Sequence, residues 1–206
     1  MPPATSSDTK SLASSRLAGT LFQPPHFPGG LLLLGGIAAS YLPRSDGHGT
    51  IRIGADYLGG ILNTLFLILG AIALLVPAYQ SRGKAGLGKE FLRVAALMLA
   101  ETIFVHLLKV ITGLWLKILS RPSGGWQGFP SGHTSAALVM SYLLTCRYPR
   151  LAIVWYAFAG LIAWSRVESG AHFPYQVVGG AIVGIFTLFL LERRFPSTIS
   201  PQKLSE

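Results

Sequence analysis

The sequence predicts an all-α integral membrane protein, a bundle of about six transmembrane helices. Half of its 206 residues are hydrophobic and only 12% are charged, whereas soluble domains carry roughly 25% charged residues. The mean hydropathy is +0.51, and the apolar residues gather in long runs between short polar segments. These three observations exclude an ordinary soluble domain and point to a chain whose helices face lipid.

Six apolar segments follow one another along the chain. They cover residues 29–42, 57–79, 91–116, 133–146, 151–164 and 173–191. A helix needs about 20 apolar residues to cross the hydrocarbon region. The segment at 57–79 carries no charge and is the clearest span, whereas the first, fourth and fifth segments need residues from their flanks to reach that length.

The two ends of the chain differ in composition from the part between them. Residues 1–26 are rich in Ser, Thr and Pro and contain no apolar core of the signal-peptide type, so we expect a flexible cytoplasmic tail. Residues 196–206 form a second, short cytoplasmic tail. We see no internal repeat and no long linker, and we therefore expect residues 27–195 to be one six-helix membrane domain.

The basic residues predict how the chain lies in the cytoplasmic membrane. With the N-terminus in the cytoplasm, eleven of the 17 Lys and Arg residues fall on the cytoplasmic side, so both termini are expected inside. The loops at 117–133 and 165–172 then meet on the outer face. The net charge of +9 does not indicate nucleic-acid binding, because the basic residues are scattered between apolar runs rather than along one face.

Two further features concern cofactors and packing. Cys146 is the single cysteine, which excludes an internal disulfide framework and a cysteine zinc cage. No group of carboxylates has metal-ligand spacing, so we expect neither a metal nor another cofactor. Gly180 and Gly184 have the small-xxx-small spacing that permits close helix approach, and we expect them to serve simple packing.

The run at 130–133 (PSGH) is the first that could carry chemistry. Ser131 is a good N-cap for the helix that follows, and the first amides of such a helix bind anions. His133 then sits in the first turn, beside any bound anion, where it could protonate the leaving oxygen of a phosphate ester. The alternative is an ordinary helix cap with an interfacial histidine.

The run at 165–172 (SRVESGAH) adds a cation and a second imidazole. Arg166 can make bidentate contacts to a phosphoryl group. His172 is a plausible nucleophile, because an imidazole can form a covalent intermediate. The alternative is an arginine that snorkels to water and a histidine that anchors the next helix. This alternative is reasonable for either residue alone, but it explains the combined pattern poorly.

These motifs resemble those of the type 2 phosphatidic acid phosphatase family, which includes membrane lipid phosphate phosphatases and is related to soluble vanadium haloperoxidases. The family signature has three parts, Lys-x6-Arg-Pro, Pro-Ser-Gly-His and Ser-Arg-x5-His. The second part matches in full at residues 130–133 and the third at residues 165–172. The resemblance covers roughly residues 91–190.

The resemblance implies a metal-independent hydrolase that acts on a lipid phosphate or diphosphate in the bilayer. His172 would attack phosphorus and form a phosphohistidine, and His133 would protonate the leaving lipid alkoxide and later activate water. The phosphoryl oxygens would be held by Arg166, Arg121, a lysine, Ser131 and the Gly132 amide. The rivals are a lipid-to-lipid phosphotransferase and a non-catalytic membrane protein that binds phospholipid head groups.

The first signature motif is irregular. Arg121 and the proline after it supply Arg-Pro, but the spacing would require a lysine where the chain has Leu114. Lys109 and Lys117 are the two candidates, and we favour Lys109 because an unpaired lysine at helix depth is costly unless it has a function. His106 lies three residues before Lys109, so the two share a helix face and could line the same site.

The residue expected behind His172 also departs from the family pattern. The family usually places an aspartate four residues after the nucleophilic histidine, where this chain has Gln176. Glutamine can accept the same hydrogen bond but brings no charge, so Glu168 is the alternative source of a carboxylate. Glu101, in the same segment as Lys109, is expected to be paired with a basic group or protonated, in a structural rather than a catalytic role.

Overall fold

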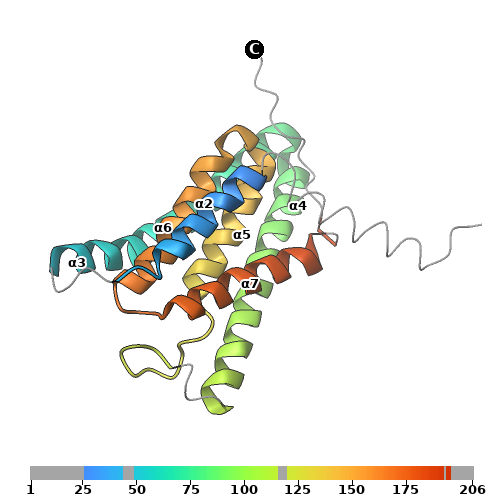
Figure 1. Cartoon of the computed structure of the whole chain (residues 1–206). Helices are drawn as coiled ribbons and strands as arrows, with labels where there is room; N and C mark the ends of the chain where they lie inside the picture. Colours follow the sequence, from blue (N-terminus) through green and yellow to red (C-terminus); the bar gives the residue numbers. More distant parts are fainter. Residues whose placement is uncertain (1–25, 44–48, 116–119, 193, 196–206) are drawn as a thin grey trace, which may run out of the picture.

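The computed structural model describes residues 26–43, 49–115, 120–192 and 194–195 (Figure 1). In chain order the elements are α2 (His26–Ala39), α3 (Gly49–Tyr57), the π-helix η1 (Leu58–Leu62), α4 (Asn63–Trp115), α5 (Gly132–Arg147), the 3-10 helix η3 (Pro149–Leu151), α6 (Ala152–Glu168) and α7 (Pro174–Leu191). No strand occurs in these ranges, so the all-α prediction is confirmed for them. Apart from His26, the predicted tails lie outside the described residues.

The described residues of the six predicted apolar segments lie mostly in helices, but the predicted count of six spans is not confirmed. Three stretches are long and apolar enough to cross a membrane, Gly49–Trp115, Pro149–Glu168 and Pro174–Leu191. Helices α2 and α5 contain 14 and 16 residues, which gives them lengths of about 21 and 24 Å, less than the hydrocarbon thickness of about 30 Å. Two predicted segments share the long helix α4.

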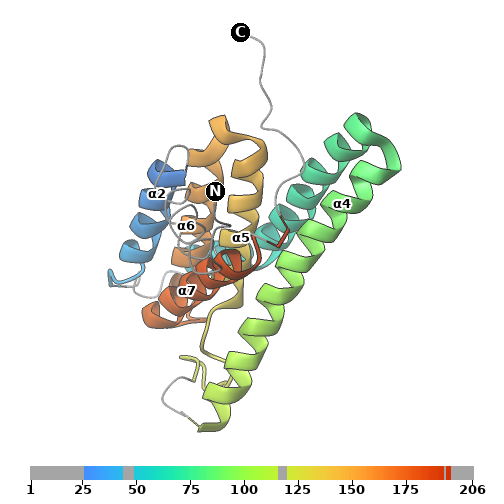
Figure 2. The ribbon, with the colours of Figure 1, turned by 90° about the vertical axis from the view of Figure 1, so that its right-hand side faces the viewer.

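Helix α4 is a hairpin of two helical limbs, which Figure 2 shows side by side. The reversal occurs at Gly83, whose φ of 59° and ψ of −150° lie outside the helical region. Glycine adopts a positive φ without steric cost. Close to the bend, a Cβ at Gly86 would collide with the carbonyl oxygen of Ala78, so a second glycine lets the limbs meet. The first limb (residues 63–82) and the second limb (residues 84–115) therefore run antiparallel.

Helix α5 forms the core of the bundle. It contacts α4, α6 and α7, and its side chains are buried almost continuously from Thr134 to Thr145. The outward faces of the other helices instead expose large apolar side chains, among them Leu34, Leu69, Leu99, Ile103, Ile182 and Phe186. So much exposed apolar surface is costly in water and typical of helices that face lipid. The chain is therefore a membrane protein.

Glycines of α7 let that helix pack directly on the start of α5. A Cβ at Gly180 would collide with the carbonyl oxygen of Ser131, and one at Gly184 would lie 3.1 Å from the Ser135 carbonyl oxygen. The predicted packing role of the two glycines is confirmed. The amide of Ser131 also donates a hydrogen bond to the carbonyl of Gln176, at 2.9 Å. The two sequence motifs are thereby brought to the same end of the bundle.

Candidate active site

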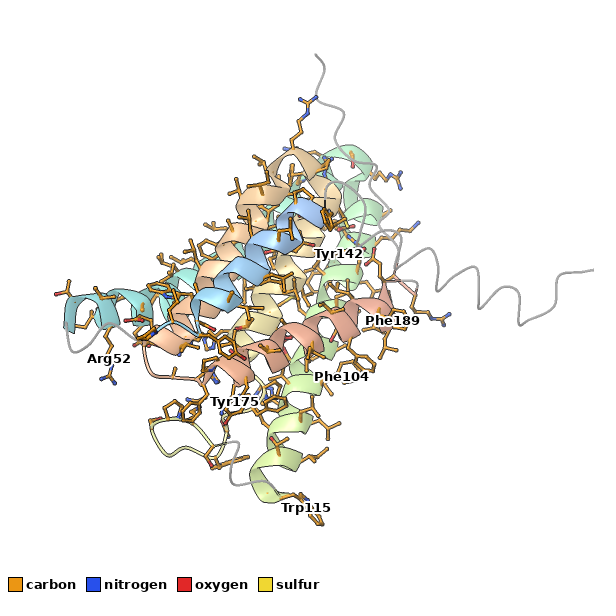
Figure 3. The ribbon with its side chains drawn as sticks, in the orientation of Figure 1. Arg52, Phe104, Trp115, Tyr142, Tyr175 and Phe189 are labelled. Atoms are coloured by element: carbon orange, nitrogen blue, oxygen red, sulfur yellow. The ribbon has the colours of Figure 1, made fainter. Side chains whose placement is uncertain are left out.

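A cavity of about 330 Å³ lies at the end of the bundle where α5 and α7 begin. Its lining includes the two motif histidines, two basic residues and several other polar residues, namely His133, His172, Lys109, Arg121, Gly132, Gln127, Asn63, Thr64, Glu101, Thr102 and His106. Figure 3 shows Tyr175 and Trp115 toward this same end, far from Tyr142. The prediction that the 117–133 and 165–172 loops meet is confirmed for their described residues.

The side chain of Gln176 fixes the tautomer of His172. Its Oε1 accepts a hydrogen bond from the Phe173 amide at 3.1 Å, and its Nε2 donates one to the Ser120 carbonyl at 2.8 Å. An amide N–H can only donate and a carbonyl can only accept, so the orientation of the glutamine amide follows. Oε1 then faces Nδ1 of His172 at 3.0 Å, and Nδ1 must carry the proton. The lone pair of His172 lies on Nε2.

The electrostatic surroundings keep His172 neutral. Only 2% of the residue is exposed. Burial lowers the pKa of His172 to about 3, against the opposing effect of the hydrogen bond with Gln176; the positive charges of Lys109, Arg121 and Arg166 lower it further. A neutral imidazole with a free Nε2 lone pair is the state in which histidine acts as a nucleophile.

Lys109 and Arg121 converge on one backbone oxygen at the cavity wall. Nζ of Lys109 donates to the Gln127 carbonyl at 2.9 Å, and Nε of Arg121 donates to the same oxygen at 3.1 Å. A tight turn holds Arg121, whose amide donates to the Gly125 carbonyl at 2.7 Å. Neither cation forms an ion pair within the described part of the chain, which leaves positive charge facing the cavity and suited to an anion.

Helix α5 presents its first turn to the cavity. Ser131 occupies the N-cap position as predicted, but its hydroxyl makes no capping hydrogen bond and instead accepts one from the Thr134 hydroxyl at 3.1 Å. Ser131 is fully buried and does not line the cavity, whereas Gly132 and His133 do. The amides at the start of α5 therefore face the cavity without competition from a capping side chain.

Arg166 stands beside the cavity rather than in its lining. The residue is 8% exposed, and its Nη1 lies 3.5 Å from Oδ1 of Asp56. Its carbonyl accepts a hydrogen bond from the His172 amide at 2.9 Å, which couples the positions of the two residues through the backbone. Sequence reasoning missed Asp56, because it lies in none of the motifs.

The remaining predicted residues fall into three groups. His106 and Lys109 both line the cavity, as predicted from their shared helix face. Glu168 is half-buried at the end of α6, and Nδ1 of His172 hydrogen-bonds Gln176. Lys117 lies outside the described residues.

Of the two alternatives for Glu101, a basic partner or protonation, no ion pair with a basic group occurs among the described residues. Glu101 is 2% exposed and lines the cavity, but its carboxylate accepts a hydrogen bond from the Thr102 hydroxyl at 3.3 Å. The basic side chains of the cavity reach toward Gln127 instead. Asn63, which also lines the cavity, was missed, although an amide at the edge of an apolar segment is a signal that could have revealed it.

The fold and the site together define a helical membrane protein with an anion-binding cavity built around two histidines. The chain belongs to the PAP2 superfamily, whose match covers residues 90–198, just over half of the sequence. Both complete motifs lie within this range, and the predicted resemblance is confirmed.

Relatives of known activity cover a smaller part of the chain. The undecaprenyl-diphosphatase BcrC of Bacillus subtilis is 33% identical over 72 residues, which are 35% of this chain and 37% of the relative. The lipid A 4'-phosphatase of Bacteroides thetaiotaomicron is 34% identical over 73 residues, 34% of this chain and 32% of the relative. The matches thus span about a third of each relative's length. No solved structure matches the chain significantly.

Proposed function

We propose that this protein is a membrane phosphatase that releases phosphate from a lipid phosphate or diphosphate. The observation that carries the proposal is the cavity lined by His133, Lys109, Arg121 and His172, in which the hydrogen bond of Nδ1 to Gln176 leaves the lone pair of His172 on Nε2. The relatives named for undecaprenyl diphosphate and lipid A support a phosphorylated lipid as the substrate class.

In the first step, Nε2 of His172 attacks phosphorus and the bond from phosphorus to the leaving oxygen breaks. Gln176 accepts the hydrogen bond from Nδ1–H and so supports the imidazole as it becomes positive. Protonated His133 gives its proton to the leaving lipid oxygen. The products of this step are a phosphohistidine and the lipid alcohol, or the lipid monophosphate when the substrate is a diphosphate.

In the second step, His133 takes a proton from water, and the resulting hydroxide attacks the phosphohistidine. The bond from phosphorus to Nε2 breaks, inorganic phosphate leaves and His172 returns to its neutral form. Lys109, Arg121 and the amides of Gly132 and His133 stabilise the negative oxygens in both transition states. Arg166 contributes a further cation from the edge of the cavity.

The cavity is proposed to open at the outer face of the cytoplasmic membrane, with both chain termini in the cytoplasm. The distribution of basic residues supports this orientation. Trp115 is 81% exposed and Trp126 is 48% exposed near the cavity, in keeping with the preference of tryptophan for the membrane surface. A Ser123→Cys variant in a Cys146→Ala background should react with an impermeant maleimide added outside intact cells.

Phosphate release by the detergent-purified chain tests the proposal. The substrates are undecaprenyl diphosphate, a lipid A phosphate and phosphatidic acid, each supplied with EDTA so that no metal can contribute. We expect release from at least one lipid and its loss in His172→Ala. Transfer of phosphate to a second lipid would indicate the phosphotransferase alternative, and lipid binding without release in the unmodified chain would indicate a non-catalytic protein.

A further inference from the structure

The side chain of Arg166 lies against Gly59, a glycine in a part of the chain that the family match does not include. A Cβ on Gly59 would lie 2.5 Å from Nη1 and 2.6 Å from Cδ of Arg166. Gly59 is buried in the π-helix η1, whereas the matched region begins at residue 90. The backbone at Gly59 therefore forms the surface on which the arginine side chain rests.

The local backbone of η1 is suited to this close approach. A π-helical turn widens the helix by one residue, and such turns are frequent at functional sites. Gly59 turns toward α6, where the Ser165 hydroxyl would lie 2.7 Å from an added Cβ. The next residue, Gly60, has nothing within 4 Å of a Cβ in the described chain. Gly59 and Gly60 are thus adjacent in one turn, but an added methyl group has room at Gly60 and none at Gly59.

An acidic residue completes the surroundings of the guanidinium. Oδ1 of Asp56 lies 3.5 Å from Nη1 of Arg166, and this pair is the one ion pair of Arg166 within the described ranges. The Asp56 side chain is 71% exposed and the Arg166 side chain is 9% exposed. An exposed partner at this distance contributes little binding energy, but it limits the directions in which the guanidinium can point.

We infer that Gly59 and Asp56 are positioning residues that hold Arg166 at the phosphate site. Gly59 provides the room in which the side chain lies, and Asp56 holds the guanidinium until the phosphate of the substrate arrives. This inference rests on the proposed function for its catalytic meaning. It adds Asp56 and Gly59, which precede the family match, to the residues that determine activity.

Comparison of Gly59→Ala with Gly60→Ala tests the inference, because the two variants add the same methyl group to the same turn. The first readout is the protection against heat unfolding that inorganic phosphate gives, and the second is kcat/KM. Displacement of a positioned group by about 1 Å can lower activity about 100-fold, so Gly59→Ala should lose most phosphate protection and about that much kcat/KM. Gly60→Ala should stay within about twofold of the unmodified protein.

Two further variants separate positioning from general damage to the fold. In an Arg166→Ala background, Gly59→Ala should cause no further loss of phosphate protection, since the side chain that it displaces is gone. Asp56→Asn should weaken phosphate protection about two- to fivefold, in keeping with an exposed ion pair. This variant also tests the inference if Gly59→Ala does not fold.

The outcomes also distinguish the inference from the proposed function. Equal phosphate protection in Gly59→Ala, Asp56→Asn and the unmodified protein would overturn the inference. Phosphate binding without phosphate release by the unmodified protein would overturn the proposed function. The comparison of phosphate protection among the variants would then still test the inference. No phosphate binding by the unmodified protein would overturn both.

Discussion

The two ends of the helical bundle both bury charged groups, but they arrange them differently. At the end that carries the cavity, Lys109 and Arg121 share a backbone carbonyl and form no ion pair among the described residues. At the opposite end, Arg93 forms ion pairs with Glu90 at 3.1 Å and with Glu192 at 3.0 Å. The guanidinium of Arg93 also donates to the Phe195 carbonyl at 3.0 Å.

The difference between the ends indicates which charges stabilise the fold and which are available to a ligand. A buried cation surrounded by carboxylates has its partners within the chain, and it fastens α4 to the end of α7. Lys109 and Arg121 face the cavity and form no ion pair among the described residues, so retaining them costs free energy that a bound anion can offset. We therefore expect changes at the cavity end to affect activity and changes at the Arg93 end to affect stability.

Replacement of His133 by alanine should have the largest effect. Loss of a general acid lowers kcat by about 100- to 10,000-fold, and the measurement is phosphate release from the preferred lipid. An aryl phosphate should be hydrolysed with a much smaller loss, because its leaving oxygen needs little protonation. A uniform loss for both substrates would show that His133 does not act as the acid.

Replacement of Arg93 by leucine should destabilise the protein and leave its chemistry intact. Glu90 and Glu192 would lose their buried partner, at a cost of about 3 kcal/mol in the free energy of unfolding. Thermal unfolding in detergent measures the loss, and kcat/KM of the folded fraction should be unchanged. Arg82→Leu, an exposed position near the bend of α4, is the matched control. The comparison between the ends fails if Arg93→Leu changes kcat/KM as strongly as Lys109→Met.

Replacement of Lys109 by methionine should weaken the interaction with phosphate while the fold is retained. A lost hydrogen bond to a charged oxygen lowers kcat/KM by about 10- to 100-fold. The control is Lys84→Met, which removes the same charge from an exposed position of α4. Equal activity in the two variants would show that Lys109 does not bind the phosphate, and Lys117 would then be the first candidate for that role.

Replacement of Gln176 by glutamate should shift the pH dependence of activity. His172 must be neutral to attack, so activity is lost as the pH falls through its pKa, which is about 3 in this protein. A carboxylate at position 176 would favour the protonated imidazole and move the acid limb of kcat/KM upward by about one pH unit. Glu168→Gln should leave the profile unchanged, because Nδ1 of His172 hydrogen-bonds Gln176. The opposite pattern would make Glu168 the orienting residue.

The parts of the fold that follow from local sequence could be predicted. Apolar runs place the helices, and two short motifs, together with the glycine spacing that lets Gly180 pack on Ser131, indicate the cavity end. The first and fourth apolar segments are already too short to span alone, in keeping with the lengths of α2 and α5. The reversal at Gly83 could not be predicted, because apolar composition does not define where a helix bends. The count of spanning helices was therefore not confirmed.

The candidate site shows a similar division. The sequence indicated His133, His172 and the cations because their spacing is local. It did not indicate Asp56, which reaches Arg166 only after α3 packs beside α6. It left open whether Glu101 has a basic partner or is protonated, and the nearby cations bind the Gln127 carbonyl. Long-range packing decides such partners, and a single sequence contains no signal for it.

Trapping of the covalent intermediate tests whether His172 is the nucleophile. The unmodified protein is mixed with a lipid whose phosphate is radiolabelled, quenched within milliseconds and digested, and the labelled peptide is identified. We expect acid-labile label on His172, which disappears when unlabelled substrate is added. Rapid release of labelled phosphate with no protein-bound label, or label on a different residue, would contradict it.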